Sequence, residues 1–136
     1  MAEYKRPIPV PDEASRPFFE GANRHELMLQ RCTICGAYLY PVKLRCDLCL
    51  NTSIEWVEAS GKGRLYSFGL MHQLYDPRFA DEIPYNVALV ELEEGIRIVS
   101  NVVGCPSSEL RIDMRLEVTF EDINDEVAIP KFKPVT

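Results

Sequence analysis

The chain has 136 residues, of which 46% are hydrophobic and 26% are charged, a composition typical of one globular domain or two very small ones. Its net charge of −6 disfavours a nucleic-acid partner, because such binding depends on neutralising phosphates. The first 15 residues lack the apolar segment of a secretory signal, and no apolar run is long enough to cross a bilayer. We therefore expect a cytoplasmic protein without a membrane partner, whose cysteines stay reduced.

An extended arm and a short helix are predicted at the start of the chain. Three prolines within residues 7–11 favour the arm. The segment SRPFFEG then suits a helix, with Ser15 as N-cap and Gly21 at the C′ position. Phe18 and Phe19 would bury their rings against the chain's own core or against a partner chain. This helix is therefore our candidate for partner docking.

Two Cys-x-x-Cys pairs, Cys32/Cys35 and Cys46/Cys49, are separated by ten residues. Zinc binds four thiolates in a tetrahedron, and each pair supplies two of them from one tight turn. Gly36 follows the first pair directly, where such a turn often needs a positive φ. Because all four positions are cysteine, no coordination position is left for water, and the predicted zinc is structural rather than catalytic. The flanking runs ELMLQRC, YLYP and SIEWVEAS are strand-like, which predicts a zinc ribbon.

Other interpretations of the cysteines remain open. An iron site of the rubredoxin type uses the same four ligands. A thioredoxin-like redox pair needs a Cys-x-x-Cys at the start of a helix, and a disulfide framework needs an oxidising compartment; the sequence supports neither. Cys105, the fifth cysteine, has neither His25 nor His72 near it in sequence. It is interpreted as a plain buried or half-buried thiol rather than a nucleophile.

Residues 60–63, SGKG, are predicted to form a flexible hinge between two modules. Five strand-like runs follow: RLYSFGLMHQ, YNVALVELE, IRIVSNVVG, RLEVTFED and EVAIPKFKP. In the fourth run, Leu116, Val118 and Phe120 alternate with polar residues. Five short strands without a long helix predict a five-stranded OB-fold barrel.

The order of these motifs resembles a known family. The run PDEASRPFFEGANRHELMLQRCTICG, a second Cys-x-x-Cys, SGKGRLYSF, PYNVALVELEEGIR and FEDINDEVAIPKFKP are similar to the acyl-CoA-associated zinc-ribbon/OB-fold family, formerly a domain of unknown function. The resemblance covers about residues 11–134 and implies a mainly β fold: a short N-terminal helical segment, a rubredoxin-like zinc ribbon and a C-terminal OB barrel. The corresponding boundaries are 1–25, 26–59 and 60–136. The family's ribbon ligands fall on the four paired cysteines.

The resemblance also implies a function. The chain is expected to be an accessory, non-catalytic subunit of a thiolase-type acyl-CoA acyltransferase complex, whose partner chain carries the catalytic cysteine and histidine. The small chain would organise this hetero-oligomer and help to bind a coenzyme A thioester at the interface. One alternative is the same role beside an aldolase or an enoyl-CoA hydratase acting on a bulky acyl-CoA. A second is a nucleic-acid-binding OB module, with Tyr66 and Phe68 stacking on bases.

The candidate residues for contact with coenzyme A or the partner lie in the longest connection, residues 73–84, and just before it. Loops beside a rigid barrel often carry recognition. The candidates are His72, Tyr75, Arg78 and Phe79. No catalytic residue is predicted in this chain.

Overall fold

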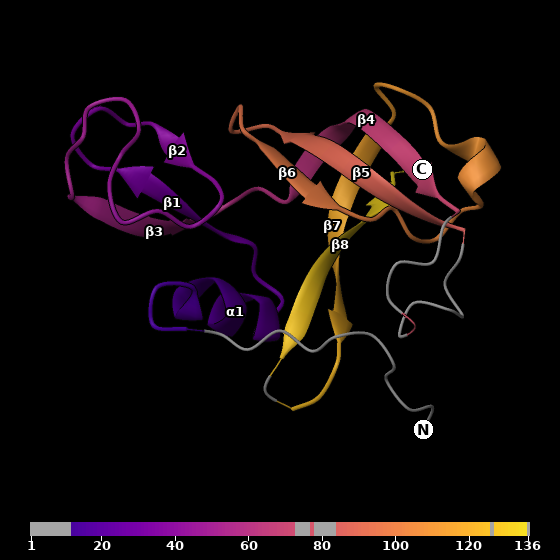
Figure 1. The fold of residues 1–136 in the computed structure, drawn as a ribbon, viewed down its shortest axis with the longest axis horizontal. Coiled ribbons are helices and arrows are strands. Elements are labelled where there is room, and N and C mark those ends of the chain that lie inside the picture. The colour runs from indigo at the N-terminus through magenta and orange to yellow at the C-terminus, as the bar shows by residue number, and fades with distance from the viewer. Residues whose placement is uncertain (1–11, 73–76, 78–83, 126, 136) are drawn as a thin grey trace.

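The computed structural model describes residues 12–72, 77, 84–125 and 127–135. These residues form one α-helix, α1 (Arg16–Asn23), and two antiparallel sheets (Figure 1). The strands are β1 (Met28–Cys32), β2 (Tyr38–Leu39), β3 (Ile54–Glu58), β4 (Lys62–Met71), β5 (Tyr85–Leu92), β6 (Arg97–Ser100), β7 (Arg115–Asp122) and β8 (Ala128–Pro134), with a 3-10 turn, η2 (Ser107–Glu109), before β7. The predicted mainly β fold is confirmed.

The start of α1 differs in detail from the prediction. Ser15 lies at the N-cap, but its side chain makes no hydrogen bond to the helix. Its Oγ instead accepts from the N–H of Asp12 at 3.0 Å, while Asp12 Oδ1 accepts from the N–H of Ser15 at 2.7 Å. Phe18 packs against the main hydrophobic core, and its ring meets that of Phe19 edge-on at a centroid distance of 5.3 Å. Phe18 therefore contributes to the chain's own core.

The end of α1 corrects the prediction for Gly21. This residue lies inside the helix, where a Cβ would come within 2.3 Å of Met28 Cγ. The missing side chain thus lets β1 begin close to the helix. The helix ends at Asn23, with Arg24 as C-cap. His25 follows at the C′ position with a left-handed φ of 62°, and the N–H of Glu26 donates to the oxygen of Gly21 at 2.8 Å as in a Schellman motif. His25 Nε2 lies 2.9 Å from Asp122 Oδ1, which ties this turn to β7.

The smaller sheet, with the strand order β2-β1-β3, is the ribbon. In Figure 1, β1 runs away from the larger sheet and ends at Cys32, so the cysteine turns lie at the far end. Gln30 is a buried polar residue on β1. Its Nε2 donates to the oxygen of Lys43 at 2.8 Å, and its Oε1 accepts from the N–H of Lys43 at 2.7 Å. This side chain therefore holds the segment that leads to the second cysteine pair.

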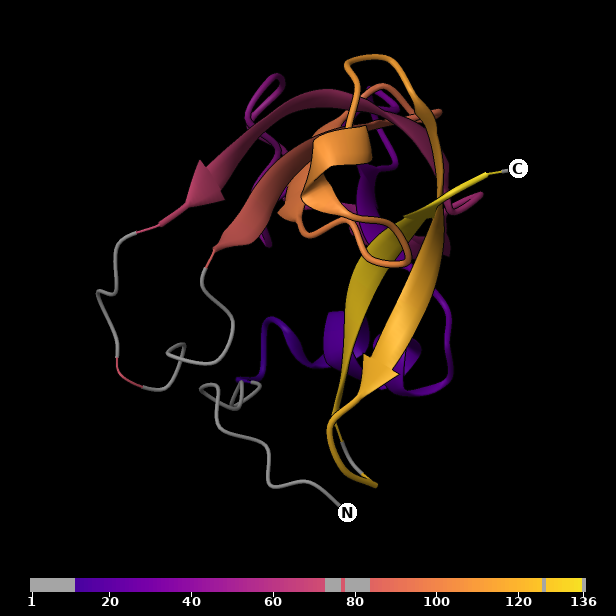
Figure 2. The ribbon, with the colours of Figure 1, turned by 90° about the vertical axis from the view of Figure 1, so that its right-hand side faces the viewer.

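The larger sheet, with the order β6-β5-β4-β7-β8, forms the predicted OB barrel (Figure 2). Tyr66 is an extra residue at a β-bulge in β4, which bends this strand between its partners β5 and β7. The two edges of the sheet meet beyond β6. Here Val103 donates its N–H to Phe132 on β8 at 2.7 Å, and Phe132 donates its N–H to Asn101 at 3.0 Å. These bonds close the barrel.

Residues 60–63, predicted to be a flexible hinge, are instead part of a packed junction. Gly61 is buried with a φ of 78°, and a Cβ there would come within 2.6 Å of Val118 Cγ1. Gly63 lies in β4, where a Cβ would come within 2.5 Å of the oxygen of Glu91. One hydrophobic cluster runs across this junction: Leu27, Leu29 and Ala59 from the ribbon side pack with the barrel core. The close packing leaves little freedom between ribbon and barrel.

Candidate functional site

The first cysteine turn follows directly from the end of β1. Cys32 donates its N–H to the oxygen of Ala37 at 2.8 Å, and its own oxygen accepts from the N–H of Gly36 at 2.9 Å. Gly36 has a φ of 78°, as predicted for this position. The turn therefore points the side chains of Cys32 and Cys35 to one side of the strand end.

The second cysteine turn repeats the hydrogen bonds of the first. Cys46 donates its N–H to the oxygen of Asn51 at 2.9 Å and accepts from the N–H of Leu50 at 3.0 Å. Leu50 occupies the position of Gly36 and also has a positive φ, 63°. A left-handed leucine costs about 1–2 kcal/mol, so the sequence alone did not indicate that this turn would match the first.

The four paired thiols converge as predicted. Their Sγ atoms all lie within 4.8 Å of one another. Cys32 and Cys49 are 3.5 Å apart, and Cys35 and Cys46 are 3.6 Å apart. Four sulfurs at about 2.3 Å from a tetrahedral zinc lie about 3.8 Å apart, so the observed arrangement is close to the one that a zinc ion needs. Cys32 and Cys46 are buried, while Cys35 and Cys49 are exposed.

Backbone N–H groups favour the thiolate form of the two buried cysteines, Cys32 and Cys46. The pKa of Cys32 is lowered to about 6, chiefly by the N–H of Cys35, against the effect of burial. The pKa of Cys46 is lowered chiefly by the N–H of Cys49. The N–H of Asn51 lowers the pKa of Cys49, but the thiol contact with Cys32 and the desolvation of the sulfur outweigh it, so this pKa is raised to about 12. The turns thus favour the thiolate, the form that binds metal, at Cys32 and Cys46, whereas the pKa values of Cys35 and Cys49 are raised.

The geometry disfavours two alternatives for the cysteines, a disulfide framework and a thioredoxin-like redox pair. All five cysteines are free, and the closest Sγ atoms are 3.5 Å apart, far from the bond length of about 2.05 Å in a disulfide. Neither pair opens a helix; the first follows a strand, and the second lies in a turn. This is not the setting of a thioredoxin-like redox pair. Cys105 is half-buried against the core, as interpreted from the sequence.

The other candidate residues are only partly placed. His72 is exposed and follows β4 directly. Tyr75, Arg78 and Phe79 lie outside the residues that the structure describes. No helix in the described part of the chain is long and apolar enough to span a membrane.

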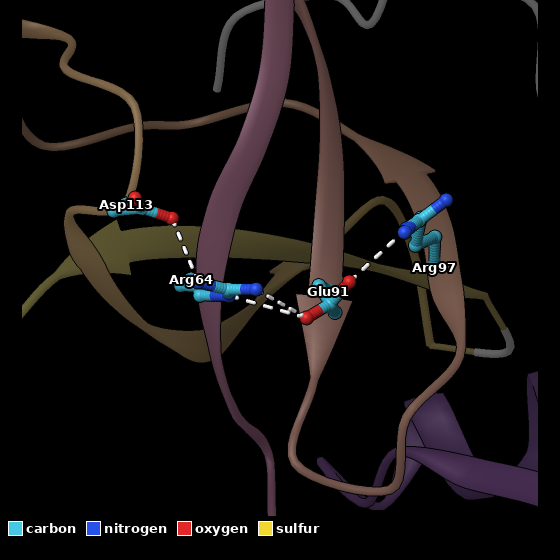
Figure 3. A network of polar contacts seen from close by, with 4 residues as sticks. All are labelled: Arg64, Glu91, Arg97 and Asp113. Carbon is cyan, nitrogen blue, oxygen red and sulfur yellow. Dashed lines mark hydrogen bonds and ion pairs between the residues drawn. The ribbon is translucent and has the colours of Figure 1, made fainter.

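A network of charged side chains crosses the outer face of the barrel (Figure 3). Arg64 bonds Glu91 at 2.7 Å and Asp113 at 2.9 Å, and Arg97 bonds the other oxygen of Glu91 at 3.1 Å. These bonds from Arg64 and then Arg97 lower the pKa of Glu91. Arg97 also covers the ring of Tyr66 at 3.8 Å. The ring face that a nucleobase would need is therefore already occupied by the guanidinium.

Apolar side chains around the cysteines were missed as functional candidates. Ile34 and Leu48 lie inside the two Cys-x-x-Cys pairs, and Leu44 and Leu50 lie beside the second pair. All four are exposed. The available signal was a large aliphatic residue inside a tight metal-binding turn, where the side chain must point away from the metal.

Two sequence families account for most of the chain. The family described as "ChsH2, rubredoxin-like zinc ribbon domain" matches residues 19–55, and "ChsH2, C-terminal OB-fold domain" matches residues 56–121. A "DUF35 domain-containing scaffold protein" of Methanocaldococcus jannaschii is 35% identical, over 82% of this chain and 84% of the relative. The chain belongs to the DUF35 family. This confirms the family that the sequence motifs indicated.

Other proteins similar to this chain are named as enzymes or enzyme subunits. A solved chain described as "Ltp2-ChsH2(DUF35) aldolase" has a TM-score of 0.82 and 35% identity, covering 93% of this chain and 98% of that one. A "Probable enoyl-CoA hydratase alpha subunit" of Thermomonospora curvata is 36% identical over 95% of this chain, but this chain spans only 40% of that relative. The "Benzoylsuccinyl-CoA thiolase subunit BbsA" of Thauera aromatica is 27% identical, over 87% of this chain and 74% of the relative.

Proposed function

We propose that this DUF35 chain is an accessory, non-catalytic subunit of a thiolase-type acyl-CoA acyltransferase complex. The observation that carries the proposal is the similarity to BbsA, which extends over 74% of a protein named as a thiolase subunit. The similarity to the hydratase subunit carries less weight, because the match leaves 60% of that relative's length uncovered. In the proposed complex, a separate chain carries out the reaction and this chain organises the assembly.

The four paired cysteines are proposed to hold a structural zinc ion. Their spacing fits tetrahedral coordination, and four cysteines leave no position for a catalytic water. When bound, the ion would contribute folding free energy and hold the two turns together. Iron has the same ligand preference in such a site, so metal analysis of the purified protein separates the two. About one zinc per chain is expected, and a metal-free folded protein would contradict the proposal.

Contact with the coenzyme A thioester is proposed at the end of the barrel where β4 stops and β5 begins, beside His72. Figure 2 shows these strand ends next to each other. An open hollow of about 670 Å³ lies there, lined by residues that include Tyr85, Asn101 and Lys131. The buried Lys131 places its ammonium 2.5 Å from Asn101 Oδ1. Lys131 also lies 4.0 Å from Glu121 Oε2, and Glu121 lines the same hollow.

Co-purification followed by reconstitution tests the function. The tagged chain, purified from its own cells, is expected to bring down a thiolase-type chain in fixed stoichiometry. The two recombinant chains are then assayed for thiolysis of acetoacetyl-CoA, where this chain alone should be inactive and should raise the activity of its partner. Binding of free coenzyme A, measured by calorimetry, should weaken in the complex with His72→Ala. Recovery of the chain as a monomer without an acyl-CoA enzyme would overturn the proposal.

A second candidate places the same subunit beside an aldolase or an enoyl-CoA hydratase. The 35% identity to the chain of "Ltp2-ChsH2(DUF35) aldolase" favours the aldolase. The co-purified chain decides between them, because the cleavage of an aldol, the hydration of an enoyl-CoA and thiolysis are separate assays.

The alternative function, a nucleic-acid-binding OB module, has a simple test. Single-stranded DNA binding is measured at 50 and 200 mM salt, and a steep loss of affinity with salt would support it. The cover of Arg97 over Tyr66 and the negative net charge of the chain count against it.

A further inference from the structure

The second half of β4 has a neighbouring strand on one side only. β5 pairs with β4 as far as its last residue, Met71. On the other side, β7 pairs only with residues 62–64, and the last backbone bond runs from the N–H of Asp113 to the oxygen of Leu65 at 2.8 Å. Among the described residues, 66–71 thus form a free sheet edge, which we call the β4 edge. Figure 2 shows it at the outside of the sheet, with β5 on its inner side.

The pairing with β5 shows which backbone groups of the β4 edge are unpaired. Neighbouring residues of a strand direct their N–H and C=O groups to opposite sides. Leu92 of β5 donates its N–H to Ile96 on the β6 side at 2.8 Å, so the odd-numbered residues of β5 are those that bond β4. Their partners on the β4 edge are Ser67, Gly69 and Met71. The N–H and C=O groups of Phe68 and Leu70 consequently face the free side.

The β4 edge lacks the features that usually protect an exposed strand. Natural proteins place charged side chains, prolines or bulges along such edges. The sequence of the β4 edge, YSFGLM, has no charge and no proline, and its bulge at Tyr66 lies at its start. By contrast β3, the outer strand of the ribbon, carries the exposed Glu55 and Glu58. The β4 edge is therefore open to pairing with a further strand.

Gly69 lies in the middle of the β4 edge, and nothing in the described chain requires a glycine there. Its φ is not left-handed, and no atom lies within 4 Å of a Cβ added to it. A glycine inside a strand weakens the strand and often marks a place where another backbone approaches closely. The described residues supply no such backbone on the free side of β4. The backbone of another molecule accounts for this glycine.

Two copies of the β4 edge complement each other. When the edges run antiparallel with Gly69 opposite Gly69 of the second copy, Phe68 of each copy lies opposite Leu70 of the other. Each of these pairs then exchanges two N–H···O=C bonds, and the glycines form the closer, non-bonded pair, with Cα atoms about 4.5 Å apart. The unpaired backbone groups of Phe68 and Leu70 all find partners in this register.

Charge favours a second copy over other occupants. The chain has a net charge of −6, so two copies repel each other unless they meet where acids do not face acids. The β4 edge is uncharged, and the nearby Arg64 is already paired with Glu91 and Asp113. A nucleic acid or an anionic membrane would need basic side chains along this edge, and a charged segment of another protein would find no counter-charge on it.

We propose that two copies of this chain associate through the β4 edge, in an antiparallel pairing that joins their larger sheets into one continuous sheet. A two-fold contact of this kind is closed, so it ends at the dimer. The dimer itself does not depend on the proposed function. In the proposed complex it would join two catalytic chains on one scaffold, and only this consequence rests on that function.

Sedimentation of the purified, zinc-loaded chain over a range of concentrations tests the proposal, after the thermal stability of each variant is checked. The wild type should pass from monomer to dimer and go no further. Leu70→Lys puts a charge on the β4 edge and should weaken dimerisation at least about tenfold. Val103→Lys is the matched control, because Val103 is 38% exposed against 39% for Leu70 but lies outside β4. It should dimerise like the wild type.

A second pair of variants tests the backbone bonds. Leu70→Pro removes an N–H that bonds no described residue of its own chain but bonds Phe68 in the dimer, and it should weaken dimerisation at least about tenfold. Leu70→Ala keeps this N–H and should shift the dimer Kd less than about threefold. Hydrogen exchange at the amides of Phe68 and Leu70 should slow as the wild type dimerises.

The outcomes separate this inference from the proposed function. A wild type that stays monomeric at every concentration overturns the dimer, whether or not a catalytic chain co-purifies. Dimerisation that is as strong in Leu70→Lys and Leu70→Pro as in the wild type overturns the β4 edge as its surface. If the amides of Phe68 and Leu70 become protected only when the co-purified catalytic chain is added, that chain and not a second copy occupies the edge.

Discussion

The ribbon and the barrel differ in how much apolar surface each buries. The barrel has a core of fully buried side chains that includes Leu65, Val90, Leu116 and Phe132. The far end of the ribbon buries little more than Leu39 and two cysteines. So small a cluster cannot offset the conformational entropy of ordering two turns. The comparison indicates that a metal replaces a core at one end of the molecule only.

The largest expected effect comes from removing a metal ligand. Cys46→Ser removes one of four thiolate ligands and should reduce zinc content well below one per chain. The folding free energy that the metal supplies, about 10–16 kcal/mol in small zinc domains, is then largely lost. Hydrogen exchange should then show loss of protection in the cysteine turns, while β4, β5 and β7 keep theirs. Cys105→Ser is the control and should retain its metal. Full protection of the turns in Cys46→Ser would show that the ribbon does not need the ion.

The next effect tests the barrel side of the comparison. Phe132 is completely buried and lies where the sheet edges meet. Phe132→Ala should lower the free energy of unfolding by about 3–5 kcal/mol, measured by urea denaturation with zinc in excess. Metal should remain bound in the folded variant. A loss of unfolding free energy below about 1 kcal/mol would mean that the packing of Phe132 in the core does not stabilise the barrel.

A smaller effect tests the packed junction between the two regions. Gly61→Ala should be destabilised by about 1–2 kcal/mol for the left-handed backbone and about 1–3 kcal/mol for the contact with Val118. Gly95→Ala is matched, because its φ of 93° is also left-handed but no atom lies within 4 Å of the added Cβ. It should lose only the backbone part. If urea denaturation gave the same loss of unfolding free energy for Gly61→Ala and Gly95→Ala, residues 60–63 would be an open hinge rather than a packed junction.

The smallest effect concerns the charged network on the barrel. The pKa of Glu91 is lowered in the folded chain by Arg64 and Arg97. Its contribution to stability is therefore present above the ordinary glutamate pKa of about 4.3 and is lost as the pH falls through the lowered value. Glu91→Gln should lower the thermal midpoint at pH 7, and the difference from wild type should shrink below about pH 4. A difference that grows on acidification would contradict this sign.

The sequence predicted the strands of the barrel well because each buries one face. Leu116, Val118 and Phe120 lie on or against the core as their alternation indicated. Predictions that depended on distant neighbours failed. Gly21 looked like a helix end, but it lies inside α1. A glycine is needed there because Met28 leaves no room for a Cβ. Residues 60–63 looked flexible, but Val118 and Glu91 lie against their glycines.

The candidate site shows the same division. The spacing of the four cysteines predicted their convergence, because two residues between ligands close one turn around one ion. The match between Gly36 and Leu50 was not predictable, since a leucine adopts a positive φ only where surrounding hydrogen bonds hold it. The exposure of Leu44 and Leu48 also could not be derived from the sequence, because aliphatic residues between strands usually enter a core.

The sequence by itself determined the mainly β fold, the four-cysteine clip and the family, because periodicity and ligand spacing are local properties of the chain. Only the tertiary structure decided that ribbon and barrel share one core through Leu27 and Leu29. It also decided that Arg97 covers Tyr66 and that Leu44 and Leu48 stay exposed. These features depend on which surfaces meet after folding.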